Sequence, residues 1–539
     1  MNENNTSMAS GAQQPAQPPN LQVVTPPPMA QETEYTKRMK EHFHFFGPIT
    51  FLYACVYALC MFRNDAGVAF PFFIAASLLY LCFSLSKLEI TLQKGSSFYM
   101  VSMVLLAVST FCTDDGRIIA LNKTGIFLLM MSLLLKQFYD TSKWKLGKYF
   151  DSIFVMTFAC LGCLPRPFSD GMNYYKGKQK NGKVWYAVLG LIIAVPLLVV
   201  VLLLLSSADA VFRDVTGRLL DSISIENIFN IVFRVAFLFM ASYMLLAYLC
   251  EKHISEQVKD RRTGEPIIAI TVTTLLSAIY LLFSGIQIIY LFLGQMQLPE
   301  GYTYAMYARE GFFQLLAVSI LNLVIVLMCM SLFKESKVLK VVLTLMSLCT
   351  FIMIASSALR MIIYIRYYYM TFLRLFVLWA LVVLFLLFVG IIINIVKESF
   401  PLFRYGVVVV TVLYLALSFS HPDYIIASIN VANAAYDDTT KWEVSEGDFF
   451  QNSQPYRDYR YLSELSADAA PVLLPYMAEL GYDLESLYTE DTWEAYHDRM
   501  GFGYHYMEHL REVTEHLNIR TFNVSRYMAK KQMERLCAR

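Results

Sequence analysis

The chain has 539 residues, of which 57% are hydrophobic and 16% are charged. Soluble domains average roughly 45–50% apolar and about 25% charged residues, so the composition excludes an ordinary soluble globular protein. The net charge of +1 excludes the strong overall field that attracts nucleic acid, and no nucleic-acid partner is expected.

Residues 1–46 are predicted to be a disordered tail followed by an interfacial helix. The tail to about residue 30 is rich in Asn, Gln, Pro and Ser and ends in Pro26–Pro28. It lacks the large apolar side chains that would offset the entropy of ordering. A proline-rich ligand for a partner domain is the alternative reading of this tail. Residues 32–46 place basic side chains opposite phenylalanines, as in a helix that lies on a membrane surface.

Residues 47–420 contain twelve apolar blocks, each close to the roughly 20 residues that a helix needs to cross about 30 Å of hydrocarbon. We therefore predict an all-α fold, a polytopic transmembrane bundle of about 11–12 helices in the cell membrane, with the lipid bilayer as its immediate partner. The blocks are 47–63, 67–86, 97–113, 118–137, 149–165, 184–206, 228–250, 267–293, 307–333, 338–359, 372–396 and 402–420.

Basic loops indicate how the blocks cross, because Lys and Arg are enriched on the cytoplasmic side. The loops on both sides of the block 149–165 are basic, so both can be cytoplasmic only if this block does not cross. Asp151 near its start and Pro165-Arg166-Pro167 at its end favour that reading. We predict a re-entrant or interfacial segment there, about eleven crossings, a cytoplasmic N terminus and an extracytoplasmic C-terminal domain. If the block does cross, the sides of one half of the chain are reversed.

Residues 421–539 are predicted to be a small soluble α-helical domain, because they contain many charged and aromatic residues and no long apolar run. Leu473, Tyr476, Met477 and Leu480 repeat at helical spacing, and Gly481 follows where a helix would stop. Further helices are expected between Thr489 and Gly501, from His505 to Leu517 and from Val524 to Arg535. This domain is the expected contact for a protein partner.

Ionisable residues in or beside the apolar blocks are the first candidates for a functional site, since they cost about 2.5–3.5 kcal/mol at a helix centre on insertion scales. We predict an intramembrane polar cluster in which carboxylates pair with arginines, as a binding site or a two-state element. The alternative is that these side chains reach the interface beside neighbouring tyrosines. The candidate residues are Asp209, Arg309, Glu310, Arg360 and Arg374.

Several of these residues belong to short motifs that occur in a fixed order. The motifs are Ser207-Ala208-Asp209, Tyr307-Ala308-Arg309-Glu310-Gly311-Phe312-Phe313, Ser357-Ala358-Leu359-Arg360 followed by Thr371 and Arg374, and Leu465-Ser466-Ala467-Asp468-Ala469. The combination resembles an uncharacterised bacterial family of polytopic membrane proteins, the domain of unknown function 4173 or the related 4153. The resemblance runs from about residue 184 to 477, implies a polytopic membrane protein and supplies no activity.

A metal site is a separate hypothesis, because His505-Tyr506-Met507-Glu508-His509 has the spacing H-x-x-E-H. On a helix this spacing places His505 and His509 on one face. A zinc site would need a further ligand from another element, and a solvated amphipathic helix is the alternative. No Gly-rich phosphate loop or nucleophile elbow occurs, so no catalytic residue and no cofactor are predicted.

Three functions remain open from the sequence. The first is a noncatalytic membrane-anchored protein with a sensing, scaffolding or envelope-associated role, in which the C-terminal domain binds a partner. The second is a transporter, for which Pro196, Gly285 and Asn394 are possible helix interruptions, although no inverted repeat is visible. The third is an intramembrane enzyme that uses the polar cluster.

Overall fold

The computed structural model describes residues 32–177, 225–257, 262–289, 304–437, 460–481, 484, 501–515 and 517–537, with a few single residues between 190 and 209. Every regular element named in these ranges is a helix, which confirms the all-α prediction. Within these described ranges, ten helices are long and apolar enough to cross a membrane by length and composition. The predicted tail, most of the block 184–206 and the helix expected after Thr489 lie outside the described residues.

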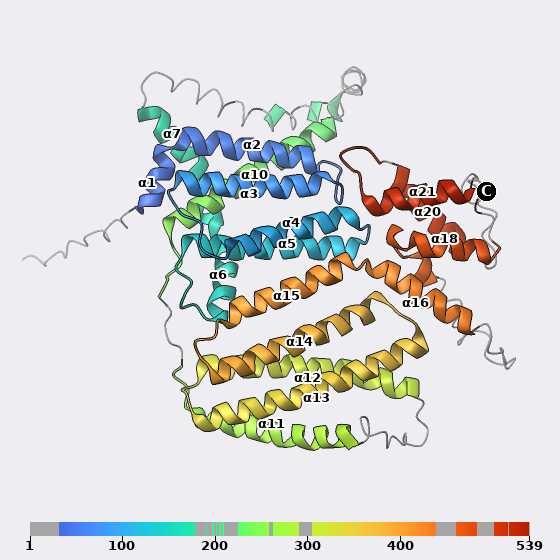
Figure 1. Cartoon of the computed structure of the whole chain (residues 1–539). Helices are drawn as coiled ribbons and strands as arrows, with labels where there is room; N and C mark the ends of the chain where they lie inside the picture. Colours follow the sequence, from blue (N-terminus) through green and yellow to red (C-terminus); the bar gives the residue numbers. More distant parts are fainter. Residues whose placement is uncertain are drawn as a thin grey trace, which may run out of the picture.

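The first core of the bundle joins the N-terminal helices to two later ones (Figure 1). Phe46, Leu85, Met103, Leu133 and Leu249 are fully buried in it. The helices around this core are α1 (Glu34–Glu41), α2 (Phe43–Met61), α3 (Ala69–Lys87), α4 (Ser96–Cys112), α5 (Gly116–Phe138), α10 (Ile225–Glu251) and α15 (Leu402–Phe419).

The second core lies beside the first and is built from α11 (Pro266–Gln287), α12 (Tyr304–Leu332), α13 (Lys337–Tyr368) and α14 (Phe372–Val396). Trp379 Nε1 of α14 donates to the Leu413 carbonyl of α15 at 3.0 Å, which connects the two cores. Apolar side chains such as Leu275 and Val341 remain exposed on the outside of these helices, as expected where lipid replaces water.

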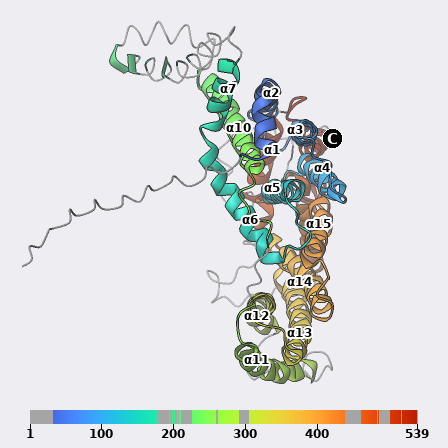
Figure 2. The same ribbon diagram turned by 90° about the vertical axis from the view of Figure 1, so that its left-hand side faces the viewer.

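The segment 149–165 does not run parallel to the other helices. It forms α6 (Leu146–Ala159) and the 3-10 helix η1 (Cys160–Cys163), followed by α7 (Arg166–Gly177). Figure 2 shows α6 lengthwise where α5 is seen end-on. Tyr149 stacks on Phe403 at the start of α15, and Arg166 pairs with Glu251 at the end of α10. Both ends of the segment therefore lie at the same end of the bundle. Its length and composition place Leu146–Cys163 among the ten candidate spans, and the non-crossing path remains a prediction.

A third core belongs to the C-terminal part of the chain. It is formed by α16 (Pro422–Asp437), the 3-10 helix η3 (Ala467–Ala469), α18 (Ala470–Glu479), α20 (Gly501–Glu515) and α21 (Val524–Cys537). Leu473, Met477, Tyr506 and Met507 are buried in it. Gly481 has a φ of +86°, the conformation that favours glycine after a helix C terminus.

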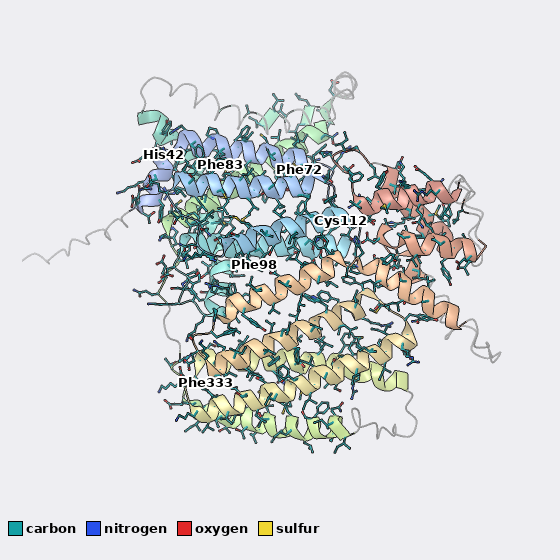
Figure 3. All side chains as sticks on the ribbon, in the orientation of Figure 1. His42, Phe72, Phe83, Phe98, Cys112 and Phe333 are labelled. Carbon is teal, nitrogen blue, oxygen red and sulfur yellow. The ribbon has the colours of Figure 1, made fainter. Side chains whose placement is uncertain are left out.

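The bundle has two chemically different ends, which we call the basic end and the domain end. In Figure 3, His42 and Phe333 mark the basic end, and Cys112 marks the domain end, next to the C-terminal helices. The N-terminal helix α1 and the C-terminal helices thus lie at opposite ends. The described Lys and Arg residues of the basic end include Lys87, Lys94, Lys136, Lys143, Lys145, Lys148, Arg166, Lys252, Arg262, Lys334, Lys337, Lys340, Lys397 and Arg404.

Two local expectations need correction. The block predicted to end at residue 359 continues as α13 to Tyr368, because the Arg360 side chain is buried against neighbouring helices and does not end the helix. The helix after the tail buries its apolar face against protein. Met39 of α1 is 2% exposed, and Arg38 donates to the Leu88 carbonyl at 3.3 Å.

Candidate functional site

Four buried aspartates meet where the C-terminal helices rest on the domain end of the bundle. Asp114 and Asp115 occupy the turn between α4 and α5, Asp423 lies in the first turn of α16, and Asp468 lies in η3. Each is between 1% and 7% exposed. Burying a carboxylate is costly unless hydrogen bonds and positive charges compensate it. We call these four residues the carboxylate cluster.

Asp468 accepts hydrogen bonds from three groups of the bundle. Thr113 Oγ1 donates to it, the Asp114 amide donates at 3.1 Å, and His421 Nδ1 lies at 3.3 Å. Burial alone would raise the pKa of Asp468, but the hydrogen bonds from His421, Ser525 and Thr113 outweigh it and hold that pKa below its ordinary value. Asp468 is therefore held as the anion, the form that accepts from all these donors.

His421, at the junction between α15 and α16, is the basic partner of Asp468. The hydrogen bond with Asp468 raises the pKa of His421, although partial burial opposes the shift. Its φ of +50° is an unusual conformation for a residue other than glycine, and such strain costs on the order of 1–3 kcal/mol. The pairing with Asp468 helps to stabilise this conformation.

Asp114 receives side chains from both last helices of the chain. Arg526 Nε of α21 donates to it at 2.5 Å, and His509 Nε2 of α20 lies at 3.9 Å. The Ala467 amide donates to its second oxygen at 3.2 Å. One carboxylate at the end of a membrane helix therefore joins three segments of the C-terminal part.

Arg117 connects the remaining two carboxylates. Asp115 caps α5 by accepting from the Arg117 amide at 2.9 Å, and Arg117 Nε donates back to it at 2.8 Å. The same guanidinium pairs with Asp423, which also accepts from the Ser466 amide at 3.0 Å. It lies 4.1 Å from the ring centroid of Phe372, a cation–π contact.

Burial and the neighbouring Asp115 charge raise the pKa of Asp423, whereas Arg117 and Ser466 oppose the rise. The environments of Asp423 and Asp468 thus push their pKa values in opposite directions. This difference follows from the donors around them: Asp468 faces hydroxyl, amide and imidazole groups, whereas Asp423 shares its guanidinium with a second carboxylate.

Neutral hydrogen bonds complete the contact between the two parts. Asn523, fully buried at the start of α21, donates to the carbonyls of Ala66 and Thr113 at 3.0 and 2.8 Å. Tyr506 OH donates to the Ser466 carbonyl at 3.1 Å. The Asn523 bonds hold α21 against two separate turns of the bundle, and the Tyr506 bond holds α20 against the segment that precedes η3.

A buried polar column continues from the carboxylate cluster into the bundle. Asn122 of α5 donates to Thr110 of α4 at 3.1 Å and accepts from Tyr414 and Ser418 of α15, each at 2.8 Å. Ser418 is also hydrogen-bonded to Ser109. The three helices joined here are those whose domain ends carry Asp114, Asp115 and His421.

The predicted intramembrane cluster is only partly described. Arg360 is 8% exposed, and its Nη2 lies 3.5 Å from Gln287 Oε1, which also accepts from Ser356 at 2.6 Å. The side chains of Arg309 and Glu310 lie outside the described residues. Asp209 is exposed, and its pairing with an arginine remains a prediction.

Two of the sequence motifs do meet. The Ser357 hydroxyl donates to the Phe312 carbonyl at 3.2 Å. A Cβ atom at Gly311 would lie 2.0 Å from Arg360 Nη1, so the missing side chain provides the space for the guanidinium. The motif containing Gly311 and the motif containing Arg360 therefore form one packed contact between α12 and α13.

Arg374 contacts tyrosines, the neighbours named in the alternative interpretation of these arginines. Its Nη1 donates to the carbonyls of Tyr368 and Tyr369, and its guanidinium lies 4.3 Å from the Tyr364 ring centroid. Tyr369 has a φ of +63°. Arg374 therefore holds the turn between α13 and α14 by satisfying carbonyls at a helix C terminus.

The two histidines of the H-x-x-E-H pattern face different surroundings. His505 is exposed, whereas His509 faces Asp114. Within the part of the chain that the structure describes, no group of three His, Cys, Asp or Glu side chains could hold a metal ion. The ligand role of His505 and His509 remains a prediction, and the structure assigns His509 a docking contact.

Sequence analysis did not identify the carboxylate cluster as a site. A signal was present in Thr113-Asp114-Asp115, which separates two apolar blocks, and in His421-Pro422-Asp423, which follows the last one. Asp468 was noted only within its motif. The structure brings these three short segments together.

A family model described as a domain of unknown function (DUF4153) matches residues 100–476. This match confirms the resemblance to the second of the two related families. The matched segment runs from α4 into α18 and contains all four carboxylates of the cluster, whereas His509 and Arg526 lie beyond it. No curated protein and no solved structure matches the chain.

Proposed function

We propose, from the premise that the chain belongs to the DUF4153 family, that this integral membrane protein is a noncatalytic sensing or scaffolding protein of the cell envelope. In this proposal the helix bundle anchors the C-terminal domain and holds it in one orientation for a protein partner. The observation that carries the proposal is the carboxylate cluster. Its buried anions are engaged by hydrogen-bond donors and cations of the protein itself, so their chemistry serves to dock one part of the chain on another.

The nature of these contacts favours a sensing role over a purely mechanical one. Charge-assisted hydrogen bonds are strong when complete, but losing one partner leaves a buried charge uncompensated. The free energy of docking therefore depends strongly on whether every partner of the carboxylate cluster is in contact (the closed arrangement) or has separated (the opened arrangement). A partner that binds the domain in only one arrangement would shift this equilibrium and, through it, the ends of α4, α5 and α15.

The proposed orientation places the N terminus in the cytoplasm and the C-terminal domain outside it. Support comes from the basic end, where the described loops between the spans collect Lys and Arg residues. The turns of the domain end combine Arg63 and Arg117 with Asp65, Asp114 and Asp115. The two ends thus differ in the sense that the positive-inside rule uses.

The orientation is tested by labelling single cysteines in a cysteine-free protein in intact cells. Glu534→Cys places the label on an exposed residue of α21, and Ser255→Cys places a matched control at the basic end. A membrane-impermeant maleimide should modify Glu534→Cys before lysis and Ser255→Cys only after lysis. The reverse result would place the domain in the cytoplasm and refute an envelope partner. Labelling of both before lysis would refute their placement on opposite sides.

A further inference from the structure

We propose that the C-terminal domain carries a binding site for anionic phospholipid, formed by α21 and the loop that precedes it against the turn between α2 and α3. An open groove of about 850 Å³ lies there. Its lining combines apolar, aromatic and basic side chains, among them Ile519, Phe522, Tyr527, Lys530 and Lys531.

The groove lies at the membrane boundary. The helices α2 and α3 have 19 residues each, which gives about 28 Å at 1.5 Å per residue, close to the roughly 30 Å thickness of the hydrocarbon core. The boundary therefore falls near their ends. Arg520 donates from Nη1 to the Leu59 carbonyl at 2.9 Å, within the last turn of α2. Leu59 is 71% exposed, as a lipid-facing side chain would be.

Backbone hydrogen bonds fix the loop in this position. The Val68 amide, at the start of α3, donates to the Phe522 carbonyl at 2.8 Å. The Asn64 side chain donates to the Arg520 carbonyl at 3.3 Å. The loop is thus attached to the α2–α3 turn independently of the carboxylate cluster.

The exposed side chains of the loop and α21 have the chemistry of an interfacial lipid contact. Ile519 at the tip of the loop is 93% exposed. Contact of this apolar side chain with hydrocarbon is more favourable than its contact with water. Phe522 and Tyr527 pair at 5.5 Å between ring centroids, and tyrosine is typical of the headgroup level. Lys530 and Lys531 follow Tyr527 by three and four residues, so they lie on the same side of α21.

The combination selects a lipid with a negative headgroup. Two adjacent ammonium groups attract anionic headgroups near a membrane surface, and the apolar tip enters the acyl region beside Leu59. Glu534 also lines the groove and is the opposing charge. This inference depends on the placement of the domain at the end of the bundle. It does not depend on which side of the cell that end faces.

The test measures contact between Ile519 and lipid in the full-length protein. A cysteine-free protein with Ile519→Cys carries an environment-sensitive NBD label and is placed in nanodiscs of phosphatidylcholine alone or of an equal mixture with phosphatidylglycerol. Lipids with a spin label near the headgroup quench NBD that lies at that depth. We expect blue-shifted emission and about threefold stronger quenching in the anionic nanodiscs than in the neutral ones.

Lys530→Gln with Lys531→Gln should reduce quenching in anionic nanodiscs to the neutral level. The charge-matched control, Lys334→Gln with Lys337→Gln at the basic end, should leave it unchanged. Water-like emission in both lipids would refute the site. Equal quenching in both lipids, unaffected by the lysine changes, would refute headgroup recognition. A response of neutral nanodiscs to inorganic phosphate alone would identify a free anion as the ligand and also refute the proposal. Both leaflets have the same composition here, so failure of the orientation test above would leave this result unaffected.

Discussion

Replacing Asp468 by asparagine tests whether the carboxylate cluster docks the C-terminal helices. Asp468→Asn keeps the size of the side chain but turns one oxygen into an NH₂ group. Thr113 and His421 both contact Oδ2, and the Asp114 amide contacts Oδ1. In one orientation the new NH₂ group faces the Asp114 amide, which is also a donor. In the other orientation it faces the protonated His421 imidazole and obliges the Thr113 hydroxyl to accept instead of donating. Hydrogen bonds to charged groups contribute about 1.5–3 kcal/mol each, so we expect docking to weaken by about 2–4 kcal/mol.

Hydrogen exchange of the full-length protein measures this loss. At 1.4 kcal/mol per factor of ten, amides of α21 should exchange about 30- to 1,000-fold faster in Asp468→Asn, while those of α14 keep their protection. Asp65→Asn is the matched control, because Asp65 lies at the same end, its side chain is 94% exposed and its Lys123 contact is 3.7 Å long. Exposed ion pairs contribute about 0–1 kcal/mol, so its effect should be small. Unchanged exchange in Asp468→Asn would refute the docking role.

Docking should be strongest between two pH limits. The pKa of Asp468 is lowered, so its contribution to docking is lost as the pH falls through that pKa. The pKa of His421 is raised, so its contribution is lost as the pH rises through the pKa of His421. His421→Gln should remove the upper limit in the same exchange assay, and an unchanged profile would contradict this assignment. Gly311→Ala should lower stability by about 1–3 kcal/mol, because the new Cβ displaces the buried Arg360. In a thermal melt Gly285→Ala, which has open space, should be neutral or stabilising by up to about 1 kcal/mol, and equal effects would refute the packing argument. Arg374→Lys should still lose more than half of the stability that Arg374→Ala loses, because a lysine cannot keep both carbonyl contacts and the planar contact with Tyr364. A lysine variant as stable as the native protein would assign Arg374 a simple charge role.

Helix positions in the membrane followed from the sequence because they depend on a local property. A span must be apolar over its whole length, so the block 372–396 coincides with α14 and the block 402–420 with α15 to within one residue. The end of α13 was missed because it depends on distant residues. Arg360 can remain inside a helix because Gly311 of α12 leaves space and Gln287 of α11 accepts a hydrogen bond. Neither neighbour is visible from the sequence around Arg360.

The carboxylate cluster was missed for the same reason on a larger scale. Thr113 and Asp468 are 355 residues apart, and nothing local distinguishes a buried aspartate in a turn from a solvated one. Polar residues between apolar blocks are most simply read as water-exposed loops. Their burial arises only because α20, α21 and η3 cover the turns, and α20 and α21 lie beyond the segment matched by the family.

The polar column explains why the cluster can affect the membrane helices and not only the domain. Asn122 joins α4, α5 and α15 through hydrogen bonds in a buried setting, where an unsatisfied amide costs free energy. The ends of the same three helices carry Asp114, Arg117 and His421, which the C-terminal segments contact directly. A displacement of α15 from α4 would therefore strain the column and the cluster together. Because coupling between two sites is reciprocal, a partner that stabilises the docked domain must also favour the closed arrangement of these helices, and a change in their packing must alter the partner's affinity by the same factor.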